Sequence, residues 1–262
     1  MPATQSITGF SSIAVELQKS AATITLNHPP QNVIDFPMMG DLRAALEQLE
    51  LRPEISVIVI TGNEKAFSAG VDVAAHLPGK VQSMLAEFHG VIHQLVSTAK
   101  VTIACVRGNC YGGGAELALM CDMVFAADSS SWGFPEIQLA CFPPVACVAL
   151  SAAVGQKRAA ELVLTGRLFN GLEAQQMGLA NAAVPEAGLA RILQDSLDRI
   201  SKLSPAALAM AKKALYAWDA IHFEKGLARA EQIYLNELMP TEDAREGIAA
   251  WLEKRRPVWK GK

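Results

Sequence analysis

Residues 107–117 read Arg-Gly-Asn-Cys-Tyr-Gly-Gly-Gly-Ala-Glu-Leu, and this stretch decides how the centre of the chain folds. It connects an apolar, strand-like run, 101–106, to a helix-like run, 116–121. A glycine-rich turn between a strand and a helix lets a ligand approach the backbone closely and points free N–H groups at it. The helix N-terminus adds partial positive charge there, which suits an anionic group or an oxygen that becomes anionic during a reaction. Taken alone, the three glycines also fit a tight packing turn.

Two nucleotide-binding interpretations of this turn do not fit the sequence. A Walker A loop ends in Gly-Lys followed by Ser or Thr, and that ending is absent here. A dinucleotide-binding fingerprint needs Gly-x-Gly-x-x-Gly after an early strand, whereas these glycines are consecutive and lie in the middle of the chain.

A second glycine-containing turn lies upstream, at Lys65-Ala66-Phe67-Ser68-Ala69-Gly70-Val71-Asp72. It follows another apolar, strand-like run, 55–61. Each of the two turns therefore comes directly after a strand of the buried type. Two such turns can each aim one backbone N–H at the same oxygen atom.

Two carboxylates accompany these turns. Glu116 falls in the first turn of the predicted helix, and Glu136 follows 20 residues later in Trp132-Gly133-Phe134-Pro135-Glu136. Proline suits the first position of a helix, so we expect a helix to begin at Pro135. Either carboxylate alone is also explained as a favourable charge at a helix N-terminus. Together with the two glycine turns, they predict a site for proton transfer beside a polarised carbonyl.

The motifs at 65–72, 112–116 and 135–136 resemble those of the enoyl-CoA hydratase/isomerase (crotonase) superfamily, in the same order and spacing. The resemblance runs from the early loop Asn27-His28-Pro29-Pro30-Gln31-Asn32 to Glu253-Lys254-Arg255. Within the superfamily the chain is similar to the cyclic dienoyl-CoA hydratases, which hydrate cyclohexa-1,5-diene-1-carbonyl-CoA in anaerobic aromatic degradation. The stretches that carry this narrower likeness are 32–35, 89–90, 106–110, 142–147 and 234–239.

The resemblance implies an α/β fold with a crotonase-like ββα spiral core and a C-terminal helical oligomerisation region. We expect residues 1–202 to form the core with the active site and residues 203–262 to form the helical region. In the superfamily this region supports trimers and hexamers, which implies a homotrimer or a homohexamer.

Roles for four residues also follow from the resemblance. Val71 and Gly113 match the two backbone N–H donors to the thioester oxygen, the oxyanion hole. Glu116 and Glu136 match the two catalytic glutamates of the hydratases. Many members that catalyse other reactions lack one of these glutamates, so the presence of both favours hydration over isomerisation, dehalogenation or decarboxylation.

Contacts with coenzyme A and with the acyl group are implied in the same way. The expected coenzyme A contacts are Asn32, Val33, Ala69, Asp72, Val73 and Lys254. The expected acyl pocket residues are Phe67, Trp132, Phe142 and Pro144. Asp72 also fits as a cap of the segment that follows it, and Lys254 fits equally as a solvated charge at a helix end. Ala74 stands where many members carry a lysine, so one phosphate contact is missing.

Pro144 departs from the wider superfamily, because many hydratases have a glycine-rich loop at this place. Proline supplies no N–H and fixes φ. This difference weakens the interpretation as a simple short-chain enoyl-CoA hydratase, and it suits a more apolar pocket for a ring.

Composition narrows the function classes further. The 262 residues are 51% hydrophobic and 19% charged, which supports a large core. A net charge of −3 gives no field that favours nucleic acid or an anionic membrane, and no apolar run approaches the length of a membrane span. The N-terminus lacks a signal peptide pattern, and five cysteines make an odd count. We therefore expect a cytoplasmic protein with free, buried thiols.

No metal or cofactor is expected, because coenzyme A is part of the substrate. Five histidines invite a metal-binding interpretation, and His89 and His93 are four residues apart. No carboxylate at ligand spacing accompanies them, so the sequence does not favour a metal site.

Periodicity predicts the elements around the motifs. We expect a hairpin from strands 13–17 and 23–26, a helix over 38–51, and strands over 55–60, 101–106 and 123–127. From Pro205 onward only helices are predicted. Residues 223, 227, 230, 234 and 238 form one apolar helical stripe.

The favoured function is a hydratase that acts on a cyclic conjugated dienoyl-CoA. Three alternatives stay open on the sequence. One is a general acyclic enoyl-CoA hydratase of fatty-acid or amino-acid catabolism. Another is an isomerase or thioester hydrolase on the same fold. The last is an acyl-CoA-binding protein without catalytic activity.

Overall fold

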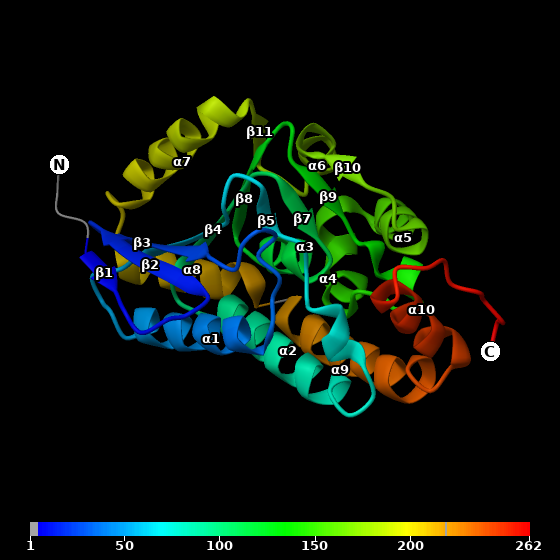
Figure 1. Ribbon diagram of the computed structural model, residues 1–262. Coiled ribbons are helices and arrows are strands. Elements are labelled where there is room, and N and C mark those ends of the chain that lie inside the picture. The colour runs from blue at the N-terminus through cyan, green and yellow to red at the C-terminus, as the bar shows by residue number, and fades with distance from the viewer. Residues whose placement is uncertain (1–4, 218) are drawn as a thin grey trace.

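Two β-sheets meet at the centre of the molecule, and helices cover them (Figure 1). The computed structural model describes residues 5–217 and 219–262. Within these residues the larger sheet has the order β1 (Gln5–Ile7), β2 (Ile13–Gln18), β3 (Ala21–Leu26), β4 (Val57–Thr61), β6 (Val101–Val106), β8 (Met123–Ala127) and β11 (Ala182–Val184). The smaller sheet has the order β10 (Phe169–Asn170), β9 (Ser131–Gly133), β7 (Asn109–Tyr111) and β5 (Ala66–Ser68).

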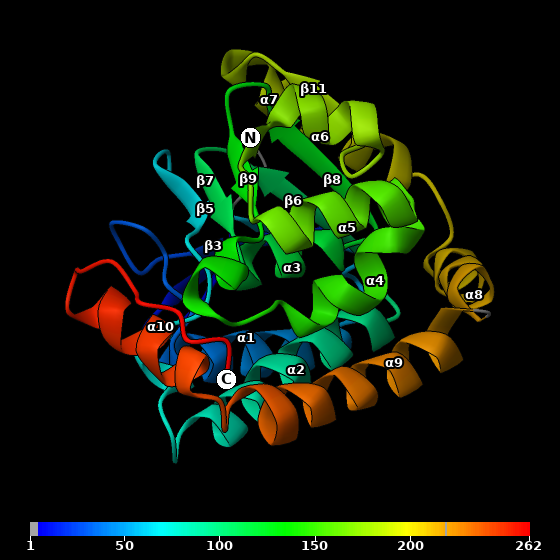
Figure 2. The ribbon, with the colours of Figure 1, turned by 90° about the vertical axis from the view of Figure 1, so that its right-hand side faces the viewer.

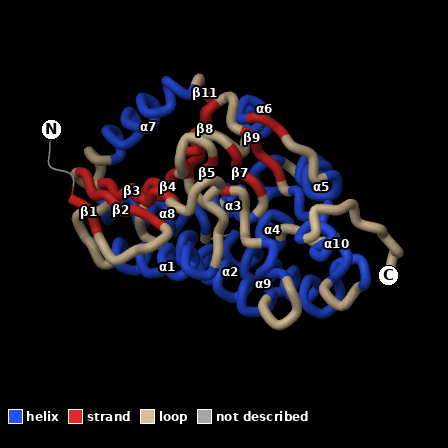
Figure 3. Tube along the Cα trace, viewed as in Figure 1, coloured by secondary structure: helices blue, strands red, loops and turns tan. Residues whose placement is uncertain are grey.

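Helices fill most of the rest of the described chain, as the secondary-structure colouring shows (Figure 3). The α-helices are α1 (Phe36–Glu50), α2 (Val81–Ser97), α3 (Gly113–Leu119), α4 (Pro144–Val154), α5 (Gln156–Thr165), α6 (Gly171–Met177), α7 (Glu186–Ile200), α8 (Pro205–Tyr216), α9 (Asp219–Ile233) and α10 (Glu242–Leu252). Two 3₁₀ helices, η1 (Val73–His76) and η2 (Pro135–Leu139), and one π-helical turn, η3 (Tyr234–Leu238), complete them.

The larger sheet is parallel from β3 through β4, β6 and β8 to β11, whereas the pairs β1–β2 and β2–β3 are antiparallel. Its central strands are buried on both faces. Along β4, Val57 and Val59 face the core beneath α7, whereas Ile58 and Ile60 face the main core with α1 and α2. Continuously apolar, β-branched runs suit strands that are covered in this way. The predicted α/β fold is confirmed.

Most of the predicted elements are present. The strands predicted at 101–106 and 123–127 have the same bounds in the structure, and the hairpin is β2 and β3. The predicted helix 38–51 begins earlier, at Phe36, because the Asp35 side chain accepts a hydrogen bond from the amide of Met38 and so caps the first turn. The helix expected at Pro135 is the short 3₁₀ helix η2.

Gly40 lies on an exposed stretch of α1, where a Cβ atom would meet nothing within 4 Å. Glycine within a helix is less favourable than alanine by about 0.5 to 1 kcal/mol. We therefore expect Gly40→Ala to raise the free energy of unfolding by about that amount, measured by urea denaturation. A lower free energy of unfolding in the variant would contradict this prediction.

The smaller sheet was not predicted, because its strands have only two or three residues each. It nevertheless positions the site. Strand β5 leads into the turn with Val71, β7 leads into α3, and β9 leads into η2 with Glu136. Because these three strands run parallel, their carboxyl ends lie at one edge of the smaller sheet.

The C-terminal helices pack against the rest of the chain. Helix α9 runs along α4 and continues into η3 (Figure 2). Helix α8 is tied to the larger sheet by Lys212, whose Nζ lies 2.8 Å from an Asp122 carboxylate oxygen and donates to the carbonyl of Lys100. The division at residue 202 stays a prediction. No helix among the described residues combines the length and the apolar character that a membrane crossing requires.

Candidate active site

The two predicted turns lie against each other. Val71 forms a parallel bridge with Ile34, in which the carbonyl of Gly70 and the amide of Asp72 bond to Ile34. The amide of Val71 therefore points away from Ile34. Gly113 is the first residue of α3, where helical N–H groups have no partner within the helix. A Cβ atom on Gly113 would lie 3.3 Å from the amide nitrogen of Val71, so the two amides are close neighbours.

Hydrogen bonds of Asn32 hold the turn that carries Val71 in place. Its side-chain nitrogen donates to the carbonyls of Ala66 and Phe67, and its side-chain oxygen accepts from the amide of His28. The hydroxyl of Ser68 donates to the backbone carbonyl of Asn32. Asn32 has no exposed surface and adopts a positive φ of 50°. The predicted contact of Asn32 with coenzyme A is therefore wrong, because protein groups surround the whole residue.

Glu116 lies in the first turn of α3, as predicted, and is buried. Its Oε1 accepts a hydrogen bond of 2.9 Å from the amide of Ala146, in the first turn of α4. Pro144 is the first residue of that helix, where a missing N–H costs nothing. Burial raises the pKa of Glu116 to about 7, although the amides of Ala146 and Val145 oppose the shift.

Glu136 comes from η2 and approaches the glycine turn of α3. Its Oε1 would lie 2.6 Å from a Cβ atom on Gly112, so only glycine leaves room for this carboxyl group. Although the residue is partly exposed as a whole, its Oε2 is buried and has no partner among the described residues. Burial and the negative charge of Glu116 raise the pKa of Glu136 well above its usual value.

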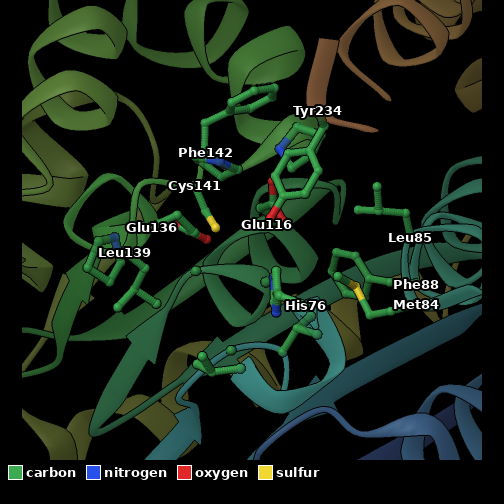
Figure 4. A pocket seen from close by; sticks show the side chains of 18 of the residues that line it. His76, Met84, Leu85, Phe88, Glu116, Glu136, Leu139, Cys141, Phe142 and Tyr234 are labelled. Atoms are coloured by element: carbon green, nitrogen blue, oxygen red, sulfur yellow. The ribbon is translucent and has the colours of Figure 1, made fainter. Parts of the chain in front are cut away.

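Both carboxyl groups open into one cavity of about 90 Å³. Figure 4 shows Glu116 and Glu136 pointing into the same space, with the thiol of Cys141 beside Glu136. Val71, Gly112 and Gly113 also line it. The cavity therefore brings together the four residues that the sequence singled out from separate motifs. A carbonyl oxygen held by two amides, with two carboxyl groups beside it, is an arrangement suited to forming an enolate.

The raised pKa of Glu116 predicts a pH-dependent stability. A carboxyl group whose pKa rises on folding holds its proton more tightly in the folded state. Its stabilising contribution is complete below the unfolded pKa near 4.5 and is lost as the pH rises through about 7. Relative to Glu116→Gln, we expect the free energy of unfolding of the wild type to fall by about 3 kcal/mol between these limits.

Urea denaturation of both proteins across this pH range checks the prediction. Because the charge of Glu116 also raises the pKa of Glu136, the difference reports on the pair of carboxyl groups. An identical pH dependence of the two proteins would contradict it.

The structure divides the four residues predicted for the acyl pocket into two pairs. Phe142 and Pro144 line the cavity. Phe67 and Trp132 do not, and the prediction for them is wrong. Phe67 is fully buried in β5, and Trp132 is fully buried in β9, where its ring stacks on Phe169 and its indole N–H donates to Ser130. Both belong to the smaller sheet, which uses them as core.

The other expected coenzyme A contacts fall into different surroundings. Ala69 and Val73 line the cavity. Val33 is half-buried and is not among the residues that line it. The Asp72 side chain accepts from the amide of Ala74 and caps η1, which confirms the capping interpretation. Lys254 is exposed just after α10 with a positive φ of 54°. Its contact with coenzyme A stays a prediction.

The sequence assigns no site role to four polar residues of the cavity wall: His76, His89, Cys141 and Tyr234. Tyr234 and His89 lie in stretches that carry the narrower resemblance, Tyr234 also belongs to the apolar stripe, and His89 with His93 invites a metal-binding interpretation. Among the described residues, no group of His, Cys, Asp or Glu side chains is placed to hold a metal ion. His89 and His93 instead pair with Glu231 and Glu224 of α9.

Comparison with known proteins agrees with this geometry. The family model described as Enoyl-CoA hydratase/isomerase matches residues 16–262. A probable enoyl-CoA hydratase of Mycobacterium tuberculosis is 35% identical over 252 residues, which cover 95% of this chain and 97% of that protein. The cyclohexa-1,5-dienecarbonyl-CoA hydratase of Thauera aromatica is 32% identical over 250 residues, covering 95% and 96%.

A solved structure shows the same fold. The crystal structure of an enoyl-CoA hydratase from Mycobacterium avium subsp. paratuberculosis superposes with a TM-score of 0.87 at 23% identity. The match covers 96% of this chain and 100% of that one. At this identity the likeness concerns the fold alone.

Proposed function

The chain belongs to the enoyl-CoA hydratase/isomerase family, and we propose on that premise that it is an acyl-CoA hydratase whose catalytic groups are Glu116 and Glu136. One observation carries the proposal: both carboxyl groups are buried at one cavity, beside the amides of Val71 and Gly113. Water addition needs a base for the water and an acid for the carbon, and two carboxyl groups divide that work.

The proposed reaction begins with the thioester oxygen accepting hydrogen bonds from the Val71 and Gly113 amides. One glutamate, as carboxylate, takes a proton from water while the water oxygen bonds to the β-carbon. The electron pair of the double bond moves toward the thioester and forms an enolate, which the two amides stabilise. The other glutamate, as carboxylic acid, then gives its proton to carbon. A pKa near 7 places Glu116 in the range where both forms are populated at neutral pH.

The favoured substrate is a cyclic conjugated dienoyl-CoA, cyclohexa-1,5-diene-1-carbonyl-CoA. The Thauera aromatica relative carries that activity in its name. The small cavity and its apolar wall of Phe88, Leu139 and Phe142 suit a compact ring better than a long acyl chain. Pro143 and Pro144 also make this edge of the cavity apolar.

A purified-protein assay with two substrates tests the proposal. We expect turnover of cyclohexa-1,5-diene-1-carbonyl-CoA with a larger kcat/KM than that of crotonyl-CoA. Rapid turnover of crotonyl-CoA alone would favour the acyclic enoyl-CoA hydratase, which the Mycobacterium tuberculosis relative supports equally.

The same assay in oxygen-18 water separates hydration from other reactions on this fold. Hydration places the label in a carbon-bound hydroxyl group. Label that appears in a carboxylic acid would indicate a thioester hydrolase, and a shifted double bond without label would indicate an isomerase.

We also propose that the protein forms a homotrimer or a homohexamer. Exposed apolar side chains on and near α8, namely Leu203, Met210 and Leu215, support association of copies. Light scattering after size exclusion should give three or six times the chain mass of 28.0 kDa. A monomeric mass would contradict the proposal.

A further inference from the structure

Two polar atoms on the cavity wall have no role in the proposed reaction. These are Nε2 of His89 and the hydroxyl oxygen of Tyr234, and neither has a hydrogen-bond partner in the described part of the chain. His89 is 2% exposed and Tyr234 is 1% exposed, and both line the cavity that holds Glu116 and Glu136. A buried polar atom without a partner costs about 1–3 kcal/mol, so two of them on one wall indicate a ligand group.

The orientation of His89 is fixed by Glu231. The imidazole lies on α2, and its Nδ1 bonds to a carboxylate oxygen of Glu231 on α9. An ionised carboxylate only accepts hydrogen bonds, so Nδ1 carries the proton. Burial lowers the pKa of His89, against the opposing effect of Glu231, and favours the neutral ring. Nε2 of the neutral ring then carries a lone pair without a partner, on a residue that lines the cavity.

Tyr234 reaches the cavity from the π-helical turn η3. Such turns are rare and occur frequently at functional sites. Its ring packs edge-on against Phe142 at a centroid distance of 5.0 Å, and His76 lies on another side at 6.4 Å. The thiol of Cys141 is a neighbour but only a weak acceptor. The Tyr234 hydroxyl is therefore still able to donate and to accept a strong hydrogen bond.

We infer that His89 and Tyr234 form a second polar subsite of the acyl pocket, which binds a hydroxyl group carried by the acyl moiety away from the thioester. A hydroxyl group donates its proton to Nε2 of His89 and accepts from the hydroxyl of Tyr234, so it satisfies both atoms. A hydrocarbon ring leaves both unsatisfied, and a carboxylate has no proton for Nε2. The inference rests on the proposed function only in treating this cavity as an acyl pocket, and it extends the ligands of that pocket to rings that carry a hydroxyl group.

Calorimetric binding of CoA thioesters that have no ring double bond tests the subsite without turnover. The ligands are cyclohexanecarbonyl-CoA and its 3-hydroxy and 4-hydroxy derivatives. We expect one hydroxy isomer to bind the wild type about tenfold more tightly than the unsubstituted ring. Tyr234→Phe should reduce this preference to about twofold or less, because the donor to the ligand hydroxyl is removed.

Tyr111→Phe is the matched control, because it removes a hydroxyl group that bonds to Asn109 and Ser131 away from the cavity. It should keep the full preference. His89→Leu should lose the preference as Tyr234→Phe does. If His89→Leu does not fold, the single-atom change Tyr234→Phe is sufficient to test the subsite.

Three outcomes would overturn the inference. In the first, neither hydroxy isomer binds the wild type more tightly than the plain ring, as expected if water alone fills the subsite. In the second, the preference survives in Tyr234→Phe and His89→Leu. In the third, a 4-carboxy derivative binds more tightly than both hydroxy isomers. A protein that keeps the preference but hydrates no acyl-CoA would refute the proposed function and leave this inference standing.

Discussion

Glu116→Gln and Glu136→Gln are each expected to lower kcat about 100- to 10,000-fold, because each removes one proton-transfer group from the cavity. Glutamine has the shape of glutamate, and in Glu116→Gln the amide oxygen still accepts from Ala146. The double variant should be little slower than the slower single variant, since residues that act as a unit are not additive. Steady-state kinetics with the preferred acyl-CoA measures all three.

Glu186→Gln is the matched control for these variants. Glu186 is also an acid in the first turn of a helix, α7, but it is exposed and does not line the cavity. If the two cavity glutamates served only as favourable charges at helix N-termini, all three substitutions would behave alike. We expect the control to stay within about twofold of the wild-type kcat, as surface substitutions usually do. A loss of less than tenfold in both cavity variants would refute their catalytic role.

Gly113→Ala is expected to lower kcat/KM about 100- to 1000-fold, the usual cost of losing one oxyanion donor. The new Cβ would lie 2.7 Å from Cγ2 of Val71 and 3.2 Å from Cζ of Phe88. The 2.7 Å contact requires Val71 to shift, and we expect this shift to move the two amides so that they no longer meet at one oxygen. Thermal unfolding of the variant shows whether the fold survives.

A second substitution makes this prediction specific. Because the closest atom belongs to the Val71 side chain, Val71→Ala in the Gly113→Ala background should restore part of kcat/KM. Val71→Ala alone should change little, since the donor is the peptide N–H. Gly40→Ala adds the same methyl group where nothing lies within 4 Å and should leave kinetics unchanged. Wild-type kcat/KM in Gly113→Ala would disprove the role of these amides.

The sequence predicts the parts of this fold that have a strong local signal. The strands at 101–106 and 123–127 are continuously apolar runs, and burial on both faces follows from that pattern. The glycine turn before Glu116 is recognisable because three consecutive glycines connect a strand-like run to a helix-like run and a second glycine turn lies upstream. The two turns suggest a shared oxygen site on sequence alone, but the choice of Val71 and Gly113 as its donors needs the resemblance, since their closeness depends on the parallel pairing of β5 and β7.

Local sequence pattern does not predict the smaller sheet or the residues that form the cavity wall. Strands of two or three residues are too short for periodicity, so the sequence does not distinguish Phe67 and Trp132, which are core residues of this sheet, from apolar residues that line the pocket. Tyr234 belongs to an apolar stripe that correctly predicts burial. The stripe does not say which surface buries it, because that depends on α9 packing along α4 and on the π-helical turn.

The hydrogen bonds of Asn32 hold the turn that carries Val71 in one conformation. The Asn32 side chain holds the carbonyls of Ala66 and Phe67, and its backbone carbonyl holds the hydroxyl of Ser68. In this loop the amides of Ala69 and Asp72 donate to the carbonyls of Gln31 and Ile34, so these two amide hydrogens should exchange with solvent as slowly as those of the neighbouring strands. We expect this loop to have the same conformation with and without substrate. The Val71 amide is then already oriented toward the thioester oxygen when the substrate binds, and no conformational step is needed to place it.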